Sequence, residues 1–307
     1  MNKQKLLQLA SQPLEELCRA ADRIRRKTCG DEFDLCTITN GKSGSCSEDC
    51  KFCAQSSGCR SEAEPYPLKD AAYFKKQAMY NQEKGVKRFS VVTSGKTLTD
   101  AEVEQLCRAY KAIAAQNGIA LCASHGLLSK QQFLKLKAAG VSRYHNNLET
   151  SRRFFPQICS THTYEDKIQA IGRAREAGLT VCSGGIIGMG ESVEDRIDLA
   201  LELRKLNITS VPINIFTPIS GTPLANLRPL SNDAVCRTVA LFRFALPWAS
   251  IRLAGGRGLL PDKGRQAFCS GANAVISGDM LTTPGINIEA DRELISELGF
   301  RLEKCND

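Results

Sequence analysis

Short strand-forming runs alternate with longer amphipathic stretches along most of the chain. A glycine stands immediately before four of these runs: Gly85, Gly118, Gly140 and Gly178, before 86–92, 119–122, 141–144 and 179–182. A glycine just past a helix adopts the left-handed conformation at little cost, so each one predicts a helix that ends where a strand begins. Four similar runs bring the number of candidate strands to eight: 35–39, 211–216, 250–253 and 274–276.

The intervening stretches carry helix signals. Thr99 followed by Glu102, and Ser129 followed by Gln132, have the spacing of a capping box. After the first of these boxes, apolar residues recur at helical spacing: Val103, Leu106, Tyr110 and Ile113. These stretches therefore predict helices with one buried face.

Strands that alternate with helices predict a parallel sheet, and eight such units predict an α/β fold, the closed (β/α)8 or TIM barrel. No linker rich in Pro, Gly or Ser divides the chain. We expect an N-terminal helical extension over 1–34 and one barrel over 35–307. In such barrels the active site lies at the carboxyl ends of the strands.

Composition excludes several classes of protein. The charge of +8 is spread along the chain, and its densest cluster, Arg23, Arg25, Arg26 and Lys27, is typical of a solvated helix face. A nucleic-acid site needs a denser patch, so we expect no nucleic-acid partner; excess positive charge instead suits an anionic small substrate.

The amino-terminal 27 residues have no apolar core of a signal peptide and predict a surface helix. No run of about 20 apolar residues exists, so we expect no membrane span. Fourteen cysteines without a secretion signal fit a reducing compartment, and we expect a cytoplasmic protein.

Three cysteines carry the strongest chemical signal. Cys46, Cys50 and Cys53 have the spacing C-x3-C-x2-C, with Phe52 just before the last. Zinc sites usually use two C-x2-C pairs or added histidines, and neither is present here. The motif resembles the signature of radical S-adenosylmethionine (SAM) enzymes. The resemblance implies a 4Fe-4S cluster with one open iron, which binds SAM and cleaves it to a 5′-deoxyadenosyl radical.

A second group of residues lies on the predicted strands themselves: Cys36, Ser90, Cys122, Cys182 and Arg252. A single buried cysteine is often inert filler, but this joint placement is unusual for packing alone. An arginine inside a barrel also needs an anion, because an unpaired buried charge costs several kcal/mol, roughly. A second, anionic iron–sulfur cluster would meet that need.

The chain further resembles the biotin synthase family over nearly its whole length. The matching stretches are 46–55, 90–95, 147–151, 181–191, 211–214, 221–224, 251–256 and 281–284. The resemblance implies insertion of sulfur into dethiobiotin from an auxiliary cluster in the barrel. It also implies an electron donor such as flavodoxin or ferredoxin, and a homodimer.

Two positions depart from that family's best-known pattern, in which the second, third and fifth strands each give a cysteine and the seventh gives an arginine. Here the second strand has Ser90, whereas Cys36 stands where a serine is usual. Serine oxygen is a poor iron–sulfur ligand beside thiolate. We therefore expect Cys36, Cys122 and Cys182 to hold the auxiliary cluster, as 2Fe-2S or a four-iron form, with Arg252 nearby or ligating.

The resemblance also implies roles for residues at strand ends. For SAM these are Asn147, Glu149 (where aspartate is usual), Lys167 (where arginine is frequent), Gly184 and Gly185; the glycines would let backbone approach SAM closely. For dethiobiotin they are Asn147, Asn214, Thr282 and Thr283. Two readings of Lys167 stay open, a contact with the SAM carboxylate or a solvent-exposed helix residue.

The remaining candidates have no spacing signal, and we assign no role to the three histidines, His125, His145 and His162. The other cysteines are expected to be filler or surface thiols: Cys18, Cys29, Cys59, Cys107, Cys159, Cys236, Cys269 and Cys305. Two alternative functions stay open. One is a radical SAM enzyme of the same branch, of hydrogenase-maturation or pyrrolysine-pathway type, and the other is an iron–sulfur redox sensor without turnover.

Overall fold

The computed structural model describes residues 1–116 and 118–302 and has the expected parallel barrel. Its strands are β1 (Glu32–Lys42), β2 (Arg88–Thr93), β3 (Ala120–Ser124), β4 (Val141–His145), β5 (Thr180–Cys182), β6 (Gly185–Ile187), β7 (Ser210–Ile215), β8 (Ser250–Leu253), β9 (Ala274–Ser277) and β10 (Arg301–Leu302). The order is β1-β2-β3-β4-β5-β7-β8-β9, and β9 pairs with β1 to close the ring. All eight predicted strands are confirmed.

Two short strands were not predicted. β6 pairs with β7 just after β5 ends, so the fifth position of the barrel is filled by two consecutive pieces. β10 pairs with the start of β1, outside the ring. β6 has three residues and β10 only two, which is too short for a clear strand pattern.

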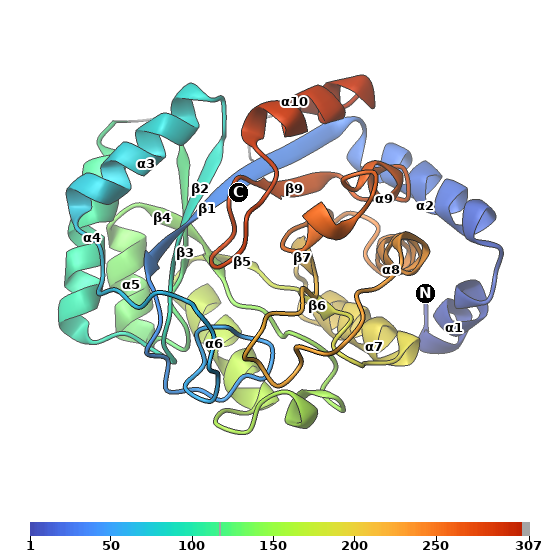
Figure 1. Cartoon of the computed structure of the whole chain (residues 1–307). Coiled ribbons are helices and arrows are strands. Elements are labelled where there is room, and N and C mark those ends of the chain that lie inside the picture. The colour runs from blue at the N-terminus through green and yellow to red at the C-terminus, as the bar shows by residue number, and fades with distance from the viewer. Residues whose placement is uncertain (117, 303–307) are drawn as a thin grey trace.

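Helices surround the strands in Figure 1. They are α1 (Lys3–Ala10), α2 (Leu14–Cys29), α3 (Ala71–Glu83), α4 (Asp100–Ala114), α5 (Lys130–Ala138), α6 (Tyr164–Glu176), α7 (Val193–Lys205), α8 (Asn232–Ala245), α9 (Arg265–Phe268) and α10 (Ile288–Glu297). Both predicted capping boxes are present, at α4 and α5. The four apolar residues predicted on α4 are all buried. Gly85, Gly140 and Gly178 stand directly after the C-cap of a helix with positive φ, as predicted. Gly118 has a φ of +146° but lies beyond the C-cap of α4 at Ala115, so the prediction of a helix cap was wrong there.

The N-terminal extension differs from the expectation in two ways. It forms two helices, because Pro13 precedes the first turn of α2, and β1 begins at Glu32, inside the range assigned to the extension. The basic cluster is also not wholly solvated. Arg25 is 2% exposed and donates to Asp22 and to the Gly30 carbonyl, while Arg23, Arg26 and Lys27 are exposed. The prediction of a solvated face was therefore wrong for Arg25.

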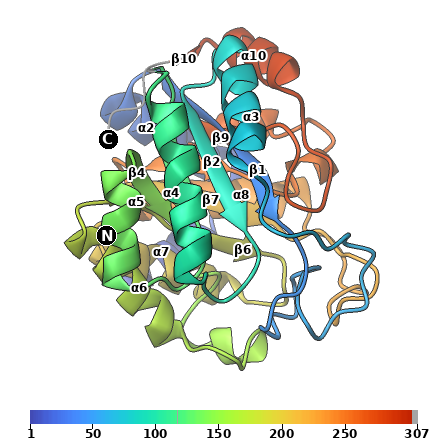
Figure 2. The ribbon, with the colours of Figure 1, turned by 90° about the vertical axis from the view of Figure 1, so that its left-hand side faces the viewer.

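Loops at the carboxyl ends of the strands form the mouth of the barrel. The longest follows β1, and Figure 2 shows it (blue) beside the segment between β7 and α8 (orange). A backbone hydrogen bond of 2.9 Å from Arg60 to Gly221 joins the two. None of the helices in the described ranges has the length and apolar character needed to cross a bilayer. Cys305 lies outside the described residues.

Candidate active site

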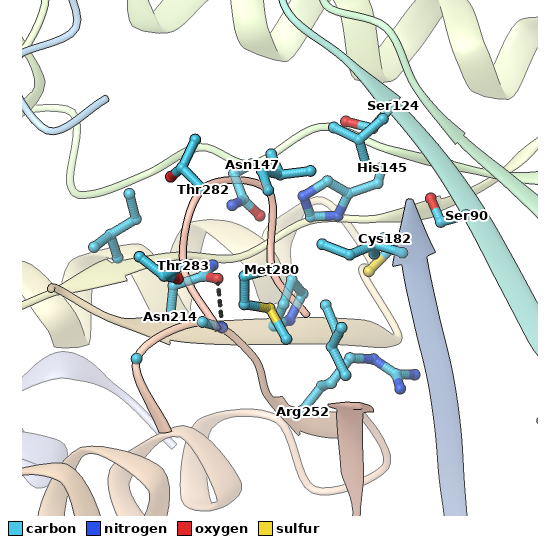
Figure 3. A pocket seen from close by; sticks show the side chains of 18 of the residues that line it. Ser90, Ser124, His145, Asn147, Cys182, Asn214, Arg252, Met280, Thr282 and Thr283 are labelled. Carbon is cyan, nitrogen blue, oxygen red and sulfur yellow. Dashed lines mark hydrogen bonds between the residues drawn. The ribbon is translucent and has the colours of Figure 1, made fainter. Parts of the chain in front are cut away.

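A cavity of about 350 Å³ runs from the mouth of the barrel into its interior. We call its inner end the floor: Cys36, Arg88, Ser90, Cys122, Arg143, Cys182 and Arg252. Its outer end is lined by Phe52, Cys53, Asn147, Glu149, Asn214, Thr282 and Thr283. Figure 3 shows Thr282 and Thr283 on one side and Ser90 and Cys182 on the other. The volume of the cavity suits a small-molecule site.

The three floor thiols come from strands far apart in the sequence and face one cavity. Cys36 on β1, Cys122 on β3 and Cys182 on β5 are 7%, 5% and 7% exposed. Cys122 pairs in register with Ser90 on β2, whose hydroxyl hydrogen-bonds to it. Closure of the barrel brings together the thiols that the strand assignments predicted.

The surroundings give these thiols different acidities. Burial raises the pKa of Cys36 to about 12, against the attraction of Arg252, and burial also raises the pKa of Cys122. At Cys182 burial is outweighed by a hydrogen bond from His145 and by the charges of Arg252 and Arg143, so the pKa falls to about 7. The floor is ready to hold at least one thiolate.

Three guanidinium groups surround the floor, where only Arg252 was expected. Arg88, Arg143 and Arg252 are 2%, 7% and 1% exposed. Arg252 donates to the Asp34 carboxylate and to the carbonyls of Asp34 and Val275 at 3.1 and 3.0 Å. Asp34 also lies 3.8 Å from Arg143. Three guanidinium groups around the floor make it suited to an anion, which fits a thiolate-bound cluster.

The predicted triad lies on the long loop after β1, which we call the triad loop (43–57). Cys46, Cys50 and Cys53 are all half-buried. Cys53 and Phe52 line the cavity, and burial raises the pKa of Cys53 to about 11. These three thiols lie within eight residues of one loop, and one of them faces the cavity. Such a donor set fits an iron–sulfur cluster.

A second segment (158–162), here called the anchor segment, holds the triad loop in place. Ile158 accepts from the Lys51 amide at 2.9 Å. The Asp49 carboxylate accepts from the amides of Ser160 and Thr161 at 2.9 and 3.2 Å. These bonds and the Ser160 hydroxyl lower the pKa of Asp49. The Glu48 carboxylate likewise accepts from the Thr161 hydroxyl at 2.8 Å. Both acidic residues inside the triad spacing therefore hold the triad loop to the anchor segment.

Cys159 and His162, for which sequence reasoning found no role, lie directly beside the triad. The Cys159 Sγ is 3.7 Å from that of Cys50 and 3.3 Å from Nδ1 of His162. His162 in turn lies 2.6 Å from the Glu48 carboxylate. Cys159 therefore has polar partners beside the triad, and its expected role as filler stays a prediction. The run Cys159-x-x-His162 is a recognisable ligand pair, but nothing local connects it to Cys50.

Polar groups at the mouth are positioned by the turn after β4. Glu149 has a φ of +68°, a left-handed conformation that is unusual for a non-glycine residue and typical of functional sites. Its Oε2 is buried without a hydrogen-bond partner among the described atoms. Lys167 lies 3.9 Å from Oε1 of Glu149, with 14% of its side chain exposed. This excludes the solvent-exposed reading of Lys167 and leaves Glu149 with an acceptor suited to a ligand hydroxyl.

Gly184 and Gly185 have a reason to be glycine within the fold, and their predicted approach to SAM stays a prediction. A Cβ at Gly184 would lie 1.9 Å from the carbonyl oxygen of Pro212, and one at Gly185 would lie 2.3 Å from that of Glu149. The close approach is therefore to the protein's own backbone. Asn147 completes the contact by accepting from the Gly184 amide at 3.0 Å.

Asn214, Thr282 and Thr283 line the outer cavity as expected. The Asn214 amide is partly committed, because Nδ2 donates to Gly185 at 3.2 Å and Oδ1 accepts from Gly255 at 3.0 Å. One N–H and one lone pair remain for a ligand. The threonines lie on a loop tied to β1 by a 3.0 Å hydrogen bond from Asn40 to Leu281.

Several site residues escaped the sequence analysis although a signal existed. Side chains two apart on a strand share a face, so Asp34, Arg88 and Arg143 follow from the inward placement of Cys36, Ser90 and His145. His125, by contrast, lies outside the cavity lining. It bonds to Thr93 and Tyr110, and burial lowers its pKa to about 3.

Comparison with known families divides the chain into two parts. Residues 42–203 match the Radical SAM superfamily, and residues 212–301 match the Biotin and Thiamin Synthesis associated domain. Biotin synthase of Akkermansia muciniphila is 54% identical over 301 residues, covering 98% of this chain and 94% of that protein. Biotin synthase of Brachyspira hyodysenteriae is 50% identical and covers 100% and 92%.

Solved structures share the fold at much lower identity. The crystal structure of methylornithine synthase has a TM-score of 0.84 at 20% identity, covering 98% of this chain and 94% of that one. The [FeFe]-hydrogenase maturase HydG has a TM-score of 0.82 at 17% identity, covering 100% and 73%. At such identities the likeness concerns the barrel alone.

Proposed function

The chain belongs to the biotin synthase family of the radical SAM superfamily, and we propose that it converts dethiobiotin to biotin with sulfur drawn from a cluster on the barrel floor. Two carbon–hydrogen bonds would break, each hydrogen atom going to the 5′-deoxyadenosyl radical of one SAM molecule. Two carbon–sulfur bonds would form as one sulfide leaves the iron of the floor cluster, which would keep the two electrons released. The observation that carries this function is that one thiol of the triad and all three floor thiols line one cavity. Cys53 lies at the mouth, and Cys36, Cys122 and Cys182 lie on the floor.

Membership of the family implies a 4Fe-4S cluster and SAM. We propose that Cys46, Cys50 and Cys53 hold the cluster, which supplies the electron for SAM cleavage when bound. The unpartnered Oε2 of Glu149 supports a contact with a SAM hydroxyl. Lys167 would act chiefly by holding Glu149, from 3.9 Å. Phe52, Asn147 and the backbone around Gly184 and Gly185 would complete the wall.

For the auxiliary cluster we propose Cys36, Cys122 and Cys182 as ligands, with Ser90 as a hydrogen-bond partner of Cys122. We propose that Arg252 stays a charged neighbour. Burial lowers its pKa, but Asp34 and the floor thiols outweigh burial and raise it, and a ligating guanidine would have to be neutral. Its hydrogen bonds to Asp34 also hold its Nη atoms.

The substrate would lie between the two thiol sets. Thr282 and Thr283 offer hydroxyls at the outer cavity for the dethiobiotin carboxylate. Asn147 and Asn214 offer amides in the same outer part of the cavity for its ureido group. This arrangement points the carbons that gain sulfur toward the floor. A flavodoxin- or ferredoxin-type donor and a homodimer stay predictions.

The test uses anaerobically reconstituted enzyme with dithionite, SAM and dethiobiotin. We expect biotin together with 5′-deoxyadenosine. SAM cleavage without biotin would favour another enzyme of this branch, and a cluster without SAM cleavage would favour the redox sensor.

The ligand set is tested by iron and sulfide analysis of Cys36→Ala beside Cys236→Ala, a matched buried thiol that is absent from the cavity lining. We expect Cys36→Ala alone to lose auxiliary iron and sulfide. Unchanged content would overturn the assignment of Cys36. Adding Ser90→Cys to Cys36→Ala should restore part of the content, since it returns a thiol to β2.

A further inference from the structure

Cys50, Cys159 and His162 form a second donor set at the mouth, and it overlaps the triad at Cys50. One donor atom from each of the three residues lies within 4.8 Å of the others. The three come from two segments, the triad loop and the anchor segment. Cys159 and His162 are only 4% and 8% exposed. This is a buried cluster of two thiols and an imidazole, the donors that thiophilic divalent metals prefer.

The distances are those of a tetrahedral site. An ion bonded at about 2.3 Å to sulfur and about 2.0 Å to nitrogen separates two sulfurs by about 3.8 Å, and a sulfur from a nitrogen by about 3.5 Å. The sulfurs of Cys50 and Cys159 are 3.7 Å apart. Cys159 Sγ lies 3.3 Å from Nδ1 and 3.8 Å from Nε2 of His162. The two separations that involve Cys159 are therefore close to tetrahedral values, and the donor atoms of Cys50 and His162 lie within 4.8 Å of each other.

The partner of the imidazole also favours a metal site. Nδ1 of His162 lies 2.6 Å from Oε2 of Glu48, which is itself 5% exposed. A histidine that binds metal through one nitrogen usually donates its other N–H to a carboxylate, which orients the ring and strengthens the ligand. Nδ1–H pointing to Glu48 leaves Nε2 for the ion. Phe155 fixes the ring from the side, in an edge contact with centroids 5.6 Å apart.

We propose that the cluster-free protein binds one divalent metal ion at Cys50, Cys159 and His162, with Zn²⁺ preferred, Glu48 orienting the histidine and water completing the tetrahedron. Zn²⁺ is preferred to Fe²⁺ at such donors by the general order of affinities. Because the site uses Cys50, it excludes the 4Fe-4S cluster of the triad. The binding itself does not depend on the proposed function; the exclusion rests on the triad assignment.

The first test is a cobalt titration of the full-length chain, stripped of metal anaerobically. We expect one Co²⁺ per chain, with the thiolate charge-transfer and tetrahedral visible bands, and displacement by Zn²⁺. Cys159→Ala and His162→Gln should each weaken binding by at least about 100-fold, and Glu48→Gln by about 10- to 100-fold. Cys53→Ala is the matched control, since it removes a triad thiol outside the donor set and should leave Co²⁺ binding unchanged.

Binding that survives in both Cys159→Ala and His162→Gln, or that is lost in Cys53→Ala, would overturn the proposal, because the ion would then sit on the triad. Circular dichroism and a melting curve show that each variant is folded. If Cys159→Ala unfolds, Cys159→Ser keeps the size and still removes the thiolate. The cobalt titration does not involve biotin formation. A negative result can therefore be told apart from failure of the proposed function.

The second test measures the exclusion. Metal-free protein is preloaded with one equivalent of Zn²⁺, and cluster assembly with iron and sulfide is followed by absorbance. We expect assembly to slow at least about tenfold in the parent and little in Cys159→Ala, because the variant binds zinc at least about 100-fold more weakly. Equal slowing in both proteins would place the inhibitory zinc elsewhere and contradict the exclusion.

Discussion

The two ends of the cavity hold their thiols in opposite ways. At the mouth, three cysteines lie within one loop, half-buried, and the loop is held by the carboxylates Glu48 and Asp49. On the floor, three cysteines lie on three strands, fully buried, among guanidinium groups. The sheet positions the floor thiols. The mouth thiols are positioned by hydrogen bonds between side chains of the triad loop and the anchor segment. Exchange of a cofactor is easier to accommodate at the mouth, because a loop can move more cheaply than a strand.

The largest effect should come from removing one thiol at each end. Cys46→Ala should abolish both 5′-deoxyadenosine and biotin, because SAM cleavage needs the triad. Cys182→Ala should abolish biotin but keep 5′-deoxyadenosine, because only the sulfur source is lost. Quantifying both products by mass spectrometry distinguishes the ends. Loss of both products in Cys182→Ala, with the 4Fe-4S cluster intact, would contradict the assignment of SAM cleavage to the mouth and of the sulfur source to the floor.

The next effect concerns the ion pair on the floor. Arg252→Met should lower the free energy of unfolding by about 3–5 kcal/mol, because it removes one partner of a buried pair. Urea denaturation of the metal-free protein measures this. Asp34→Asn with Arg252→Met should cost less than the sum of the single changes. Additive losses would show that the two side chains do not interact.

A smaller effect, on the affinity for SAM, is expected from changing Glu149, the hydrogen-bond acceptor at the mouth of the barrel. Glu149→Gln keeps the shape but removes the charge, and a hydrogen bond to a charged group contributes about 1.5–3 kcal/mol. We expect the Kd for SAM to rise about 10- to 100-fold while the melting temperature is kept. Equilibrium binding of SAM to the loaded enzyme measures it, with the exposed Glu165→Gln as control. Equal affinities of the parent and Glu149→Gln for SAM would show that Glu149 does not bind SAM.

The smallest effect should come from an ion pair at the mouth. Lys96 lies 3.8 Å from Glu48 and has 43% of its side chain exposed. Lys96→Met should change the free energy of unfolding by less than about 1 kcal/mol, because solvent screens the pair. The same urea experiment compares it with Arg252→Met. A loss as large as that of Arg252→Met would mean that the mouth is as rigidly built as the floor.

Much of this architecture follows from local patterns. Capping boxes at Thr99 and Ser129, and glycines before strands, depend on contacts within a few residues, so they are visible in the sequence. The barrel followed from counting these units. Arg25 escaped prediction because its guanidinium also lies over the ring of Phe300, 4.6 Å from the centroid, and that residue is at the other end of the chain. A basic run alone does not show which member turns inward.

The sequence by itself determined the strand–helix alternation, the triad and the inward face of each strand, because each depends on a spacing of a few residues. Only the tertiary structure decided that Cys159 lies beside Cys50, 109 residues away, and that three arginines share one floor with Asp34. It also decided that Gly184 and Gly185 make room for backbone. Contacts between distant segments are set by how the barrel closes, and no local pattern carries that information.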